Sequence, residues 1–273
     1  MNTRFKDKVI MLTGAAACNP QKQMGFAGET VWRFFKEGGS AAIITDVQDN
    51  EGEESVISLS KNGYDSFYSH LDVTQEKEWE DVALKALEKY GKIDYLVNIA
   101  GILDPKPISE IDTQDWKKVI DISLTGVFLG TKIISKIMSQ NGGGAIVNIS
   151  SMGALNGSAT YGSAYGASRS ALLNFTKSTA LHYGSKGIRA NAILPGWTRT
   201  PFTEYLYKDK IQREYRSNRV PLGRWGVPSD IASSILFMLS EDASYITGSS
   251  LLVDGGVMAG ELSRPANPLQ DAD

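Results

Sequence analysis

The sequence is poor in the residues that cross-link small secreted domains or hold transition metals. It contains one cysteine, Cys18, and two histidines, His70 and His182, in 273 residues. A single thiol cannot form an intrachain disulfide, and two distant imidazoles form no cluster with metal-ligand spacing. We therefore expect no disulfide and no metal site built from these residue types.

Long apolar runs and an excess of charge of one sign are also missing. No apolar run approaches the roughly 20 residues that span a bilayer, and the N-terminal segment lacks the apolar stretch of a secretory signal. With 28 basic and 31 acidic residues the formal net charge is only −3, so nothing favours nucleic acid or a membrane as partner. We expect a cytoplasmic protein that acts on a small molecule.

Short apolar runs alternate regularly with longer helical patterns, which is typical of βαβ units. Strands are expected at residues 9–12, 41–45, 66–71, 94–98, 145–149, 189–194 and 249–253. This pattern predicts an α/β single-domain Rossmann fold with a doubly wound, parallel, seven-stranded sheet. The domain should cover residues 1–260, including a substrate lid at about 200–226, and be followed by a polar tail at 261–273. The aromatic and apolar lid residues Phe202, Tyr205, Leu206 and Tyr207 are candidate pocket residues, or else belong to an amphipathic lid helix.

A glycine-containing loop joins the first strand to a helix. Backbone amides at such a helix start bind a pyrophosphate, so Gly14, Gly25 and Phe26 are candidate cofactor contacts. Asp46 ends the second strand, where a carboxylate accepts hydrogen bonds from adenosine ribose hydroxyls and repels a 2′-phosphate. No arginine follows Asp46, so the sequence favours NAD over NADP, although Lys22 in the loop is a cation that could reach the adenosine end.

Further motifs follow in a fixed order along the chain. They are TGAAACNPQKQMGFA, Asp72-Val73, Asn98-Ile99-Ala100-Gly101, Ser151, Tyr165, Pro195-Gly196 and Asp254-Gly255-Gly256. Together they resemble the motifs of the short-chain dehydrogenase/reductase family over about residues 5 to 258. The resemblance implies an enzyme that moves a hydride between nicotinamide and a substrate carbon.

The resemblance also implies a role for each matching residue. Asp72 and Val73 would contact the adenine, and Asn98, Ala100 and Gly101 would brace the central strands beside it. The nicotinamide end would be held by Pro195, Gly196, Thr198 and Thr200, together with Tyr165 and Arg169. Members of the family assemble as homodimers or homotetramers, here through the expected helices 113–139 and 164–183.

The expected reaction centre departs from the family at two positions. Tyr165 would transfer the substrate's hydroxyl proton, and Ser151 would hydrogen-bond the substrate oxygen. Arg169 stands where the family has a lysine; it keeps the positive charge that favours a phenolate but cannot release a proton. Ser123 stands where the family has an asparagine.

The glycine loop also departs from the family. It carries about seven extra residues relative to the usual loop, and its third glycine is replaced by Ala27.

These departures leave three hypotheses open. The first is an NAD(H)-dependent dehydrogenase with a Ser151–Tyr165–Arg169 centre that interconverts a secondary alcohol and a ketone. The second is non-standard chemistry such as dehalogenation, because halohydrin dehalogenases resemble this family and use a Ser–Tyr–Arg triad. The third is a non-catalytic NAD-binding protein. Asp46 and Asp72 favour the first, because a dehalogenase without a dinucleotide has no evident use for them.

Overall fold

The apolar runs of the sequence form the strands of one parallel sheet. A computed structural model describes residues 3–157 and 162–260, so the tail at 261–273 lies outside the described residues. The strands are β1 (Val9–Thr13), β2 (Ala41–Asp46), β3 (Asp65–His70), β4 (Tyr95–Asn98), β5 (Gly144–Ile149), β6 (Ile188–Pro195) and β7 (Ser250–Val253). Their order is β3-β2-β1-β4-β5-β6-β7, and every neighbouring pair is parallel. The predicted doubly wound sheet is confirmed, with strand ends shifted by a residue or two.

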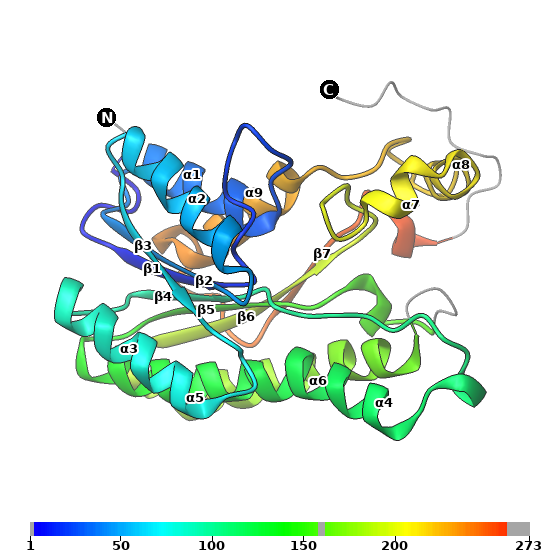
Figure 1. Cartoon of the computed structure of the whole chain (residues 1–273). Coiled ribbons are helices and arrows are strands. Elements are labelled where there is room, and N and C mark those ends of the chain that lie inside the picture. Colours follow the sequence, from blue (N-terminus) through cyan, green and yellow to red (C-terminus); the bar gives the residue numbers. More distant parts are fainter. Residues whose placement is uncertain (1–2, 158–161, 261–273) are drawn as a thin grey trace.

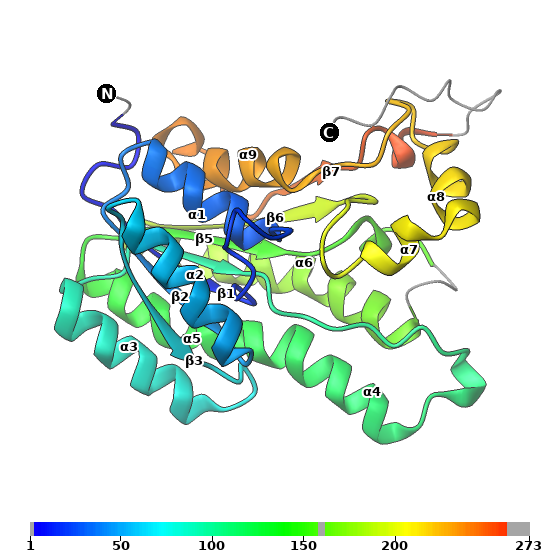
Figure 2. The ribbon, with the colours of Figure 1, turned by 45° about the horizontal axis from the view of Figure 1, so that its top comes forward.

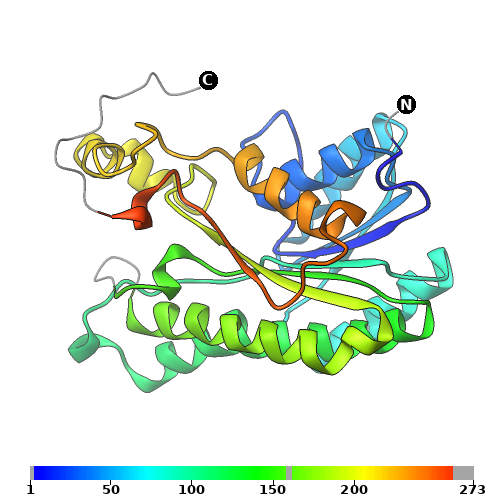
Figure 3. The same cartoon turned by 180° about the vertical axis from the view of Figure 1, so that it is seen from behind.

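Helices cover both faces of this sheet (Figure 1). One layer contains α1 (Phe26–Lys36), α2 (Asp49–Lys61) and α9 (Pro228–Leu239), and the other contains α3 (Glu76–Tyr90), α4 (Thr113–Ile120), α5 (Gly126–Gln140) and α6 (Ser163–Tyr183). The view from behind shows the same two layers (Figure 3). Two short helices, α7 (Glu204–Lys208) and α8 (Lys210–Ser217), lie beyond the carboxyl ends of the strands, within the expected lid.

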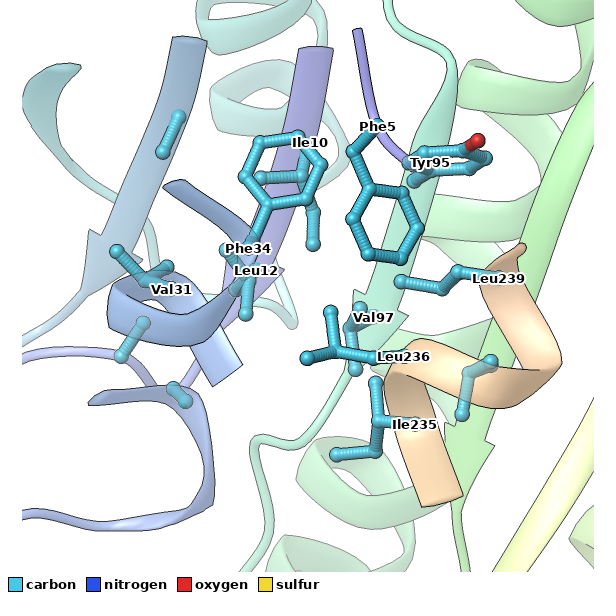
Figure 4. Packing of buried hydrophobic residues seen from close by; sticks show 14 of the residues in the cluster. Phe5, Ile10, Leu12, Val31, Phe34, Tyr95, Val97, Ile235, Leu236 and Leu239 are labelled. Atoms are coloured by element: carbon cyan, nitrogen blue, oxygen red, sulfur yellow. The ribbon is translucent and has the colours of Figure 1, made fainter. Parts of the chain in front are cut away.

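Each face of the sheet has its own apolar core. On the side of α1 and α9, Phe5 and Phe34 pack with ring centroids 5.2 Å apart, and Phe5 meets Tyr95 edge-on at 6.0 Å. Leu236 of α9 joins this cluster (Figure 4). On the other side the fully buried Trp79 of α3 packs with residues of α5 and the central strands. Burial on both faces explains why the central strands are continuously apolar rather than alternating.

The predicted helix 113–139 is not a regular α-helix throughout. A π-helical segment, Asp121–Thr125, separates α4 from α5. The combined run Thr113–Gln140 has 28 residues, and the mean hydropathy of its most apolar window is 1.2, so by length and composition alone it could cross a membrane. Polar residues interrupt the run, so it is not the continuous apolar stretch whose absence the sequence indicated. In the fold this run is a core helix, because 56% of its most apolar window is buried.

The order of the strands positions a crevice. The chain runs outward from β1 to β3 on one side and from β4 to β7 on the other, so the direction reverses between β1 and β4. Doubly wound folds bind their ligands beyond the carboxyl ends of the strands at this point of reversal.

Candidate active site

A cavity of about 560 Å³ lies at the carboxyl ends of the strands, beneath the lid. It is lined by all of the predicted site residues except Asn98 and Ser123: Gly14, Gly25, Phe26, Asp46, Asp72, Val73, Ala100, Gly101, Ser151, Tyr165, Arg169, Pro195, Gly196, Thr198 and Thr200. Residues that are up to 186 positions apart, from Gly14 to Thr200, are thus brought into one space. The charged side chains among the described lining residues are those of Asp46, Asp72 and Arg169.

The glycines of the first loop permit close approaches of the backbone. Gly14 has φ of +63°, and a Cβ there would lie 2.9 Å from the backbone N and Cα of Ala100 at the end of β4. A Cβ at Gly28 would collide with the carbonyl oxygen of Ala17. Gly28 therefore permits the close contact between the loop and α1, one residue after the position where Ala27 replaces the third glycine. Gly25, at the start of α1, has open space beside it.

The extended loop is fixed to the helices behind it. The amide of Cys18 donates to Ser55 Oγ at 3.0 Å, and the indole of Trp32 donates to the carbonyl of Cys18 at 2.6 Å. Burial raises the pKa of the Cys18 thiol, so the thiol is protonated and serves as a packing group. Lys22, the cation left open as an adenosine-end contact, forms an ion pair with Glu54.

Asp46 is held rigidly at the end of β2. Its Oδ2 accepts from the amide of Ala16 at 3.0 Å, and its Oδ1 accepts from the amides of Val47 and Gln48 at 2.8 and 3.2 Å. Oδ1 already accepts two hydrogen bonds, but Oδ2 accepts one and has a second lone pair, so Asp46 can still accept a hydrogen bond from a ligand in the cavity. Its neighbour Asp72 accepts from the amide and hydroxyl of Thr74 at 2.9 and 2.8 Å.

Ser151, Tyr165 and Arg169 meet at the other end of the cavity. Ser151 follows β5 and caps a 3₁₀ turn, where its Oγ accepts from the amide of Gly153 at 3.0 Å. Tyr165 lies in the first turn of α6, and Arg169 lies one turn later with its Cζ 4.9 Å from the centre of the Tyr165 ring. The spacing of four residues on one helix accounts for this arrangement.

The arginine is almost fully enclosed. Its side chain is 4% exposed, and one terminal nitrogen donates to the carbonyl of Ile149 at 2.8 Å. The Nε has no hydrogen-bond partner among the described residues. The other terminal nitrogen lies where a Cβ at Gly101 would be. Arg169 thus places a fixed positive charge beside the Tyr165 ring.

The structure places Ser123 and Asn98 outside the cavity lining. Ser123 lies in the π-helical segment, is fully buried, and its Oγ lies 3.3 Å from the amide of Ile102. Asn98 donates from Nδ2 to Asn148 Oδ1 at 2.9 Å. The Asn98–Asn148 bond joins β4 to β5, which fits the expected bracing of the central strands. Ser123 was expected to act in catalysis, but its contact holds the backbone of Ile102, and Ile102 itself lines the cavity.

The remaining lining residues form an apolar chamber next to Tyr165. Sequence reasoning anticipated Phe202, Tyr205 and Leu206, which line it, and Tyr207, which instead packs edge-on against Trp225 with centroids 5.4 Å apart. It missed a further set of mostly apolar residues: Ile102, Leu103, Ile122, Met152, Trp197, Pro201 and Trp225. Several of them directly adjoin motif residues, as Met152 follows Ser151 and Trp197 follows Gly196, so the neighbours of the motifs were an available signal. Trp225 adjoins no motif, and the fold alone places it at the cavity. Tyr161, which precedes Tyr165 by four residues and is expected to be an aromatic residue of the substrate loop, lies outside the described residues.

No metal centre is formed by the part of the chain that the structure describes, since no three His, Cys, Asp or Glu side chains are grouped there. The site is therefore an elongated cavity with an acidic end at Asp46 and Asp72 and a Ser–Tyr–Arg group at the other end.

Known proteins share this arrangement of the chain. A family model described as enoyl-(acyl carrier protein) reductase matches residues 22–258. The cis-4-hydroxycyclohexanecarboxylate dehydrogenase of Sinomonas cyclohexanicum is 38% identical over 261 residues, which are 95% of this chain and 100% of that protein. The 3-alpha-(or 20-beta)-hydroxysteroid dehydrogenase of Mycobacterium tuberculosis is 35% identical over 95% of this chain and 93% of that protein. A crystal structure of levodione reductase has a TM-score of 0.86 and 31% identity, with 94% of this chain and 100% of that chain covered.

Proposed function

Because the chain belongs to the short-chain dehydrogenase/reductase family and is an oxidoreductase, we propose that it interconverts a secondary alcohol and a ketone with NAD(H). One observation carries this proposal. The same cavity contains the acidic adenosine end at Asp46 and the Ser151–Tyr165–Arg169 group. A dehalogenase that binds no dinucleotide would have no use for the acidic adenosine end at Asp46.

The fit of a dinucleotide rests on the shape and charge of the cavity. Gly14 keeps the loop close to Ala100, and the start of α1 at Gly25 offers backbone amides to a pyrophosphate. Asp46 supports a preference for NAD, since its charge favours ribose hydroxyls and repels a 2′-phosphate. Lys22 is the cation that the sequence indicated near this end of the cavity, and it forms an ion pair with Glu54.

Side chains of the protein handle the proton of the reaction. Bound nicotinamide supplies the donor or acceptor of the hydride. The Ser151 hydroxyl donates to the substrate oxygen, and the Tyr165 hydroxyl gives or takes its proton. Arg169 holds its positive charge against the Tyr165 ring, with its Cζ 4.9 Å from the ring centre. Arginine cannot pass a proton onward, and Ser123 is buried against Ile102, so we propose that Tyr165 exchanges its proton with solvent or a ribose hydroxyl.

The apolar chamber favours a neutral, ring-bearing substrate. Trp197, Trp225 and Met152 line it, and Arg169 is its only charged side chain among the described residues. The named relatives act on alicyclic rings, one of them bearing a carboxylate. Because the described chamber offers no second cation for a carboxylate, we propose that this enzyme takes an uncharged alicyclic alcohol or ketone.

Assembly and location are further proposals. Phe128 of α5 and Leu181 of α6 are 46% and 83% exposed. The rings of Phe128 and Phe175 pack with their centroids 6.4 Å apart. Apolar side chains on this outer face support a homodimer or homotetramer formed through these helices. A cytoplasmic location is supported by the single, buried, unpaired cysteine.

The test is turnover of NAD⁺ at 340 nm with a panel of neutral cyclic alcohols, carried out on the wild type and Tyr165→Phe. We expect turnover with at least one alcohol, and a loss of about 10²–10⁴-fold in kcat in the variant. NADH affinity, measured by fluorescence, should stay within about twofold of the wild type because only the phenolic proton donor is removed. Halide release from a vicinal halohydrin without any use of NAD⁺ would contradict the proposal.

A further inference from the structure

The extended loop between β1 and α1 reaches the lid across the mouth of the cavity. Gln23 Nε2 donates to Glu204 Oε2 at 2.7 Å. Glu204 is the first residue of α7, 181 positions further along the chain. Figure 2 shows the loop (dark blue) beside the segment that leads into α7 (yellow).

Glu204 is a strong acceptor because it is also paired with an arginine. Arg199 Nε and its terminal nitrogen donate to the two carboxylate oxygens at 3.0 and 3.2 Å, a two-pronged contact. The hydrogen bond from Arg199, with a smaller contribution from Gln23, lowers the pKa of the Glu204 carboxyl. Glu204 is therefore ionised at neutral pH, and the hydrogen bond from Gln23 is charge-assisted.

Both sides of the contact are anchored. On the loop side, the backbone of Cys18 forms hydrogen bonds with the side chains of Ser55 and Trp32. On the lid side, the Arg199 guanidinium lies 4.3 Å from the centre of the Tyr207 ring. Tyr207 is buried and packs on Trp225. The Gln23–Glu204 bond thus joins two supported structures rather than two loose loops.

The bond closes the space between two walls of the cavity. Ala17, Gly25 and Phe26 of the loop line one wall. Thr200, Phe202 and Thr203, which precede Glu204, line the other wall. A dinucleotide whose pyrophosphate binds at the start of α1 would lie between these walls, and its exit past this edge would require them to part.

We propose that Gln23, Glu204 and Arg199 form a latch through which the extended glycine loop slows release of the dinucleotide. The proposal rests on the proposed function, because the retained ligand is NAD(H). These three residues are positioning residues, since none of them lines the cavity. The role also accounts for the extra length of the loop, because only an extended loop brings a side chain to α7.

The experiment compares Gln23→Ala with Gln21→Ala as a matched control. Gln21 lies on the same loop, is exposed, and only its backbone amide is hydrogen-bonded, to Asn19. Stopped-flow displacement of NADH gives the dissociation rate, and hydrogen exchange of the protein without cofactor gives the mobility of residues 204–208. We expect Gln23→Ala to release NADH about three- to tenfold faster and to exchange faster at α7, while Gln21→Ala matches the wild type.

The outcomes separate the latch from the proposed function. A Gln23→Ala protein with wild-type release and wild-type exchange would overturn the latch and leave the dehydrogenase assignment standing. Faster release in both variants would also overturn it, because the effect would then belong to the loop in general. A wild-type protein that binds no NADH would refute the proposed function. It would also refute the retention of cofactor by the latch, whatever rate of hydrogen exchange is measured at α7.

Discussion

At the scale of single residues, the arginine at position 169 is the main departure from the family pattern. Its guanidinium is enclosed by the carbonyl of Ile149 on one side and by the backbone of Gly101 on the other. Arginine supplies a planar, permanently charged group with several donors, whereas lysine supplies a smaller ammonium that can lose a proton. In the proposed mechanism this position therefore supplies a positive charge and no proton relay.

We predict that Gly101→Ala lowers kcat/KM by at least about tenfold, because the added methyl group collides with the Arg169 guanidinium and overpacking forces side chains to move. Arg169→Lys should keep or raise dehydrogenase activity. The double variant Gly101→Ala, Arg169→Lys should recover much of the loss, since lysine has no atom at the colliding position. Steady-state kinetics of the wild type, the two single variants and the double variant measures the coupling between positions 101 and 169. Thermal unfolding of each protein checks that it is folded.

Equal losses from Gly101→Ala in the arginine and lysine backgrounds would show that the two residues do not interact. Inactivity of Arg169→Lys alone would show that the guanidinium shape is required, which would favour unusual chemistry.

Residue roles were only partly predictable from the sequence. Motif spacing located the residues that line the cavity from Gly14 to Thr200, because the carboxyl ends of parallel strands lie together whatever the conformation of the loops. It did not locate Ser123 correctly, because the π-helical segment and the contact with Ile102 depend on packing between α4, α5 and the loop after β4. Tyr207 was misassigned for a similar reason: Trp225 and two arginines surround it.

At the scale of secondary-structure elements, the polar contacts between them decide the shape of the site. The loop after β1 is held by Ser55 of α2, Trp32 of α1 and Glu204 of α7, all distant in sequence. No local pattern predicts such partners. The strands and most helices were predictable because each carries its own periodicity of apolar residues.

A titratable pair joins α2 to β3 beside the adenosine end. His70 Nδ1 lies 2.8 Å from Asp49 Oδ1, and this hydrogen bond raises the pKa of His70 above its ordinary value of 6.5. The pKa of Asp49 is lowered by hydrogen bonds from Tyr68 and from His70. A raised histidine pKa gives stability that is complete below pH 6.5 and is lost as the pH rises through the folded value.

We predict that NMR titration gives a His70 pKa above 6.5, and that Asp49→Asn lowers it towards 6.5 because the charged acceptor is lost. Removal of His182 by His182→Gln assigns the signal, since these are the only two histidines. The stability difference between wild type and Asp49→Asn should shrink as the pH rises through the His70 pKa. An identical His70 titration in both proteins would show that the pair does not form in solution.

At the scale of the whole molecule, the sheet places the two halves of the site at one edge. The reversal between β1 and β4 opens the crevice, and the acidic end and the Ser–Tyr–Arg end lie on its two sides. The sequence predicted this topology because the central strands are buried, apolar and separated by helices, although the edge strand β3 is mostly polar and partly exposed. It did not predict the apolar chamber, because those side chains lie on loops and on the lid.

The central claim is that this crevice holds NAD(H), with Asp46 excluding the phosphorylated cofactor. Calorimetric titration of the wild type with NADH and then with NADPH tests it most directly. We predict that NADH binds at least about tenfold more tightly than NADPH, a difference of about 1.4 kcal/mol. Tighter binding of NADPH, or no heat with either dinucleotide, would contradict the account.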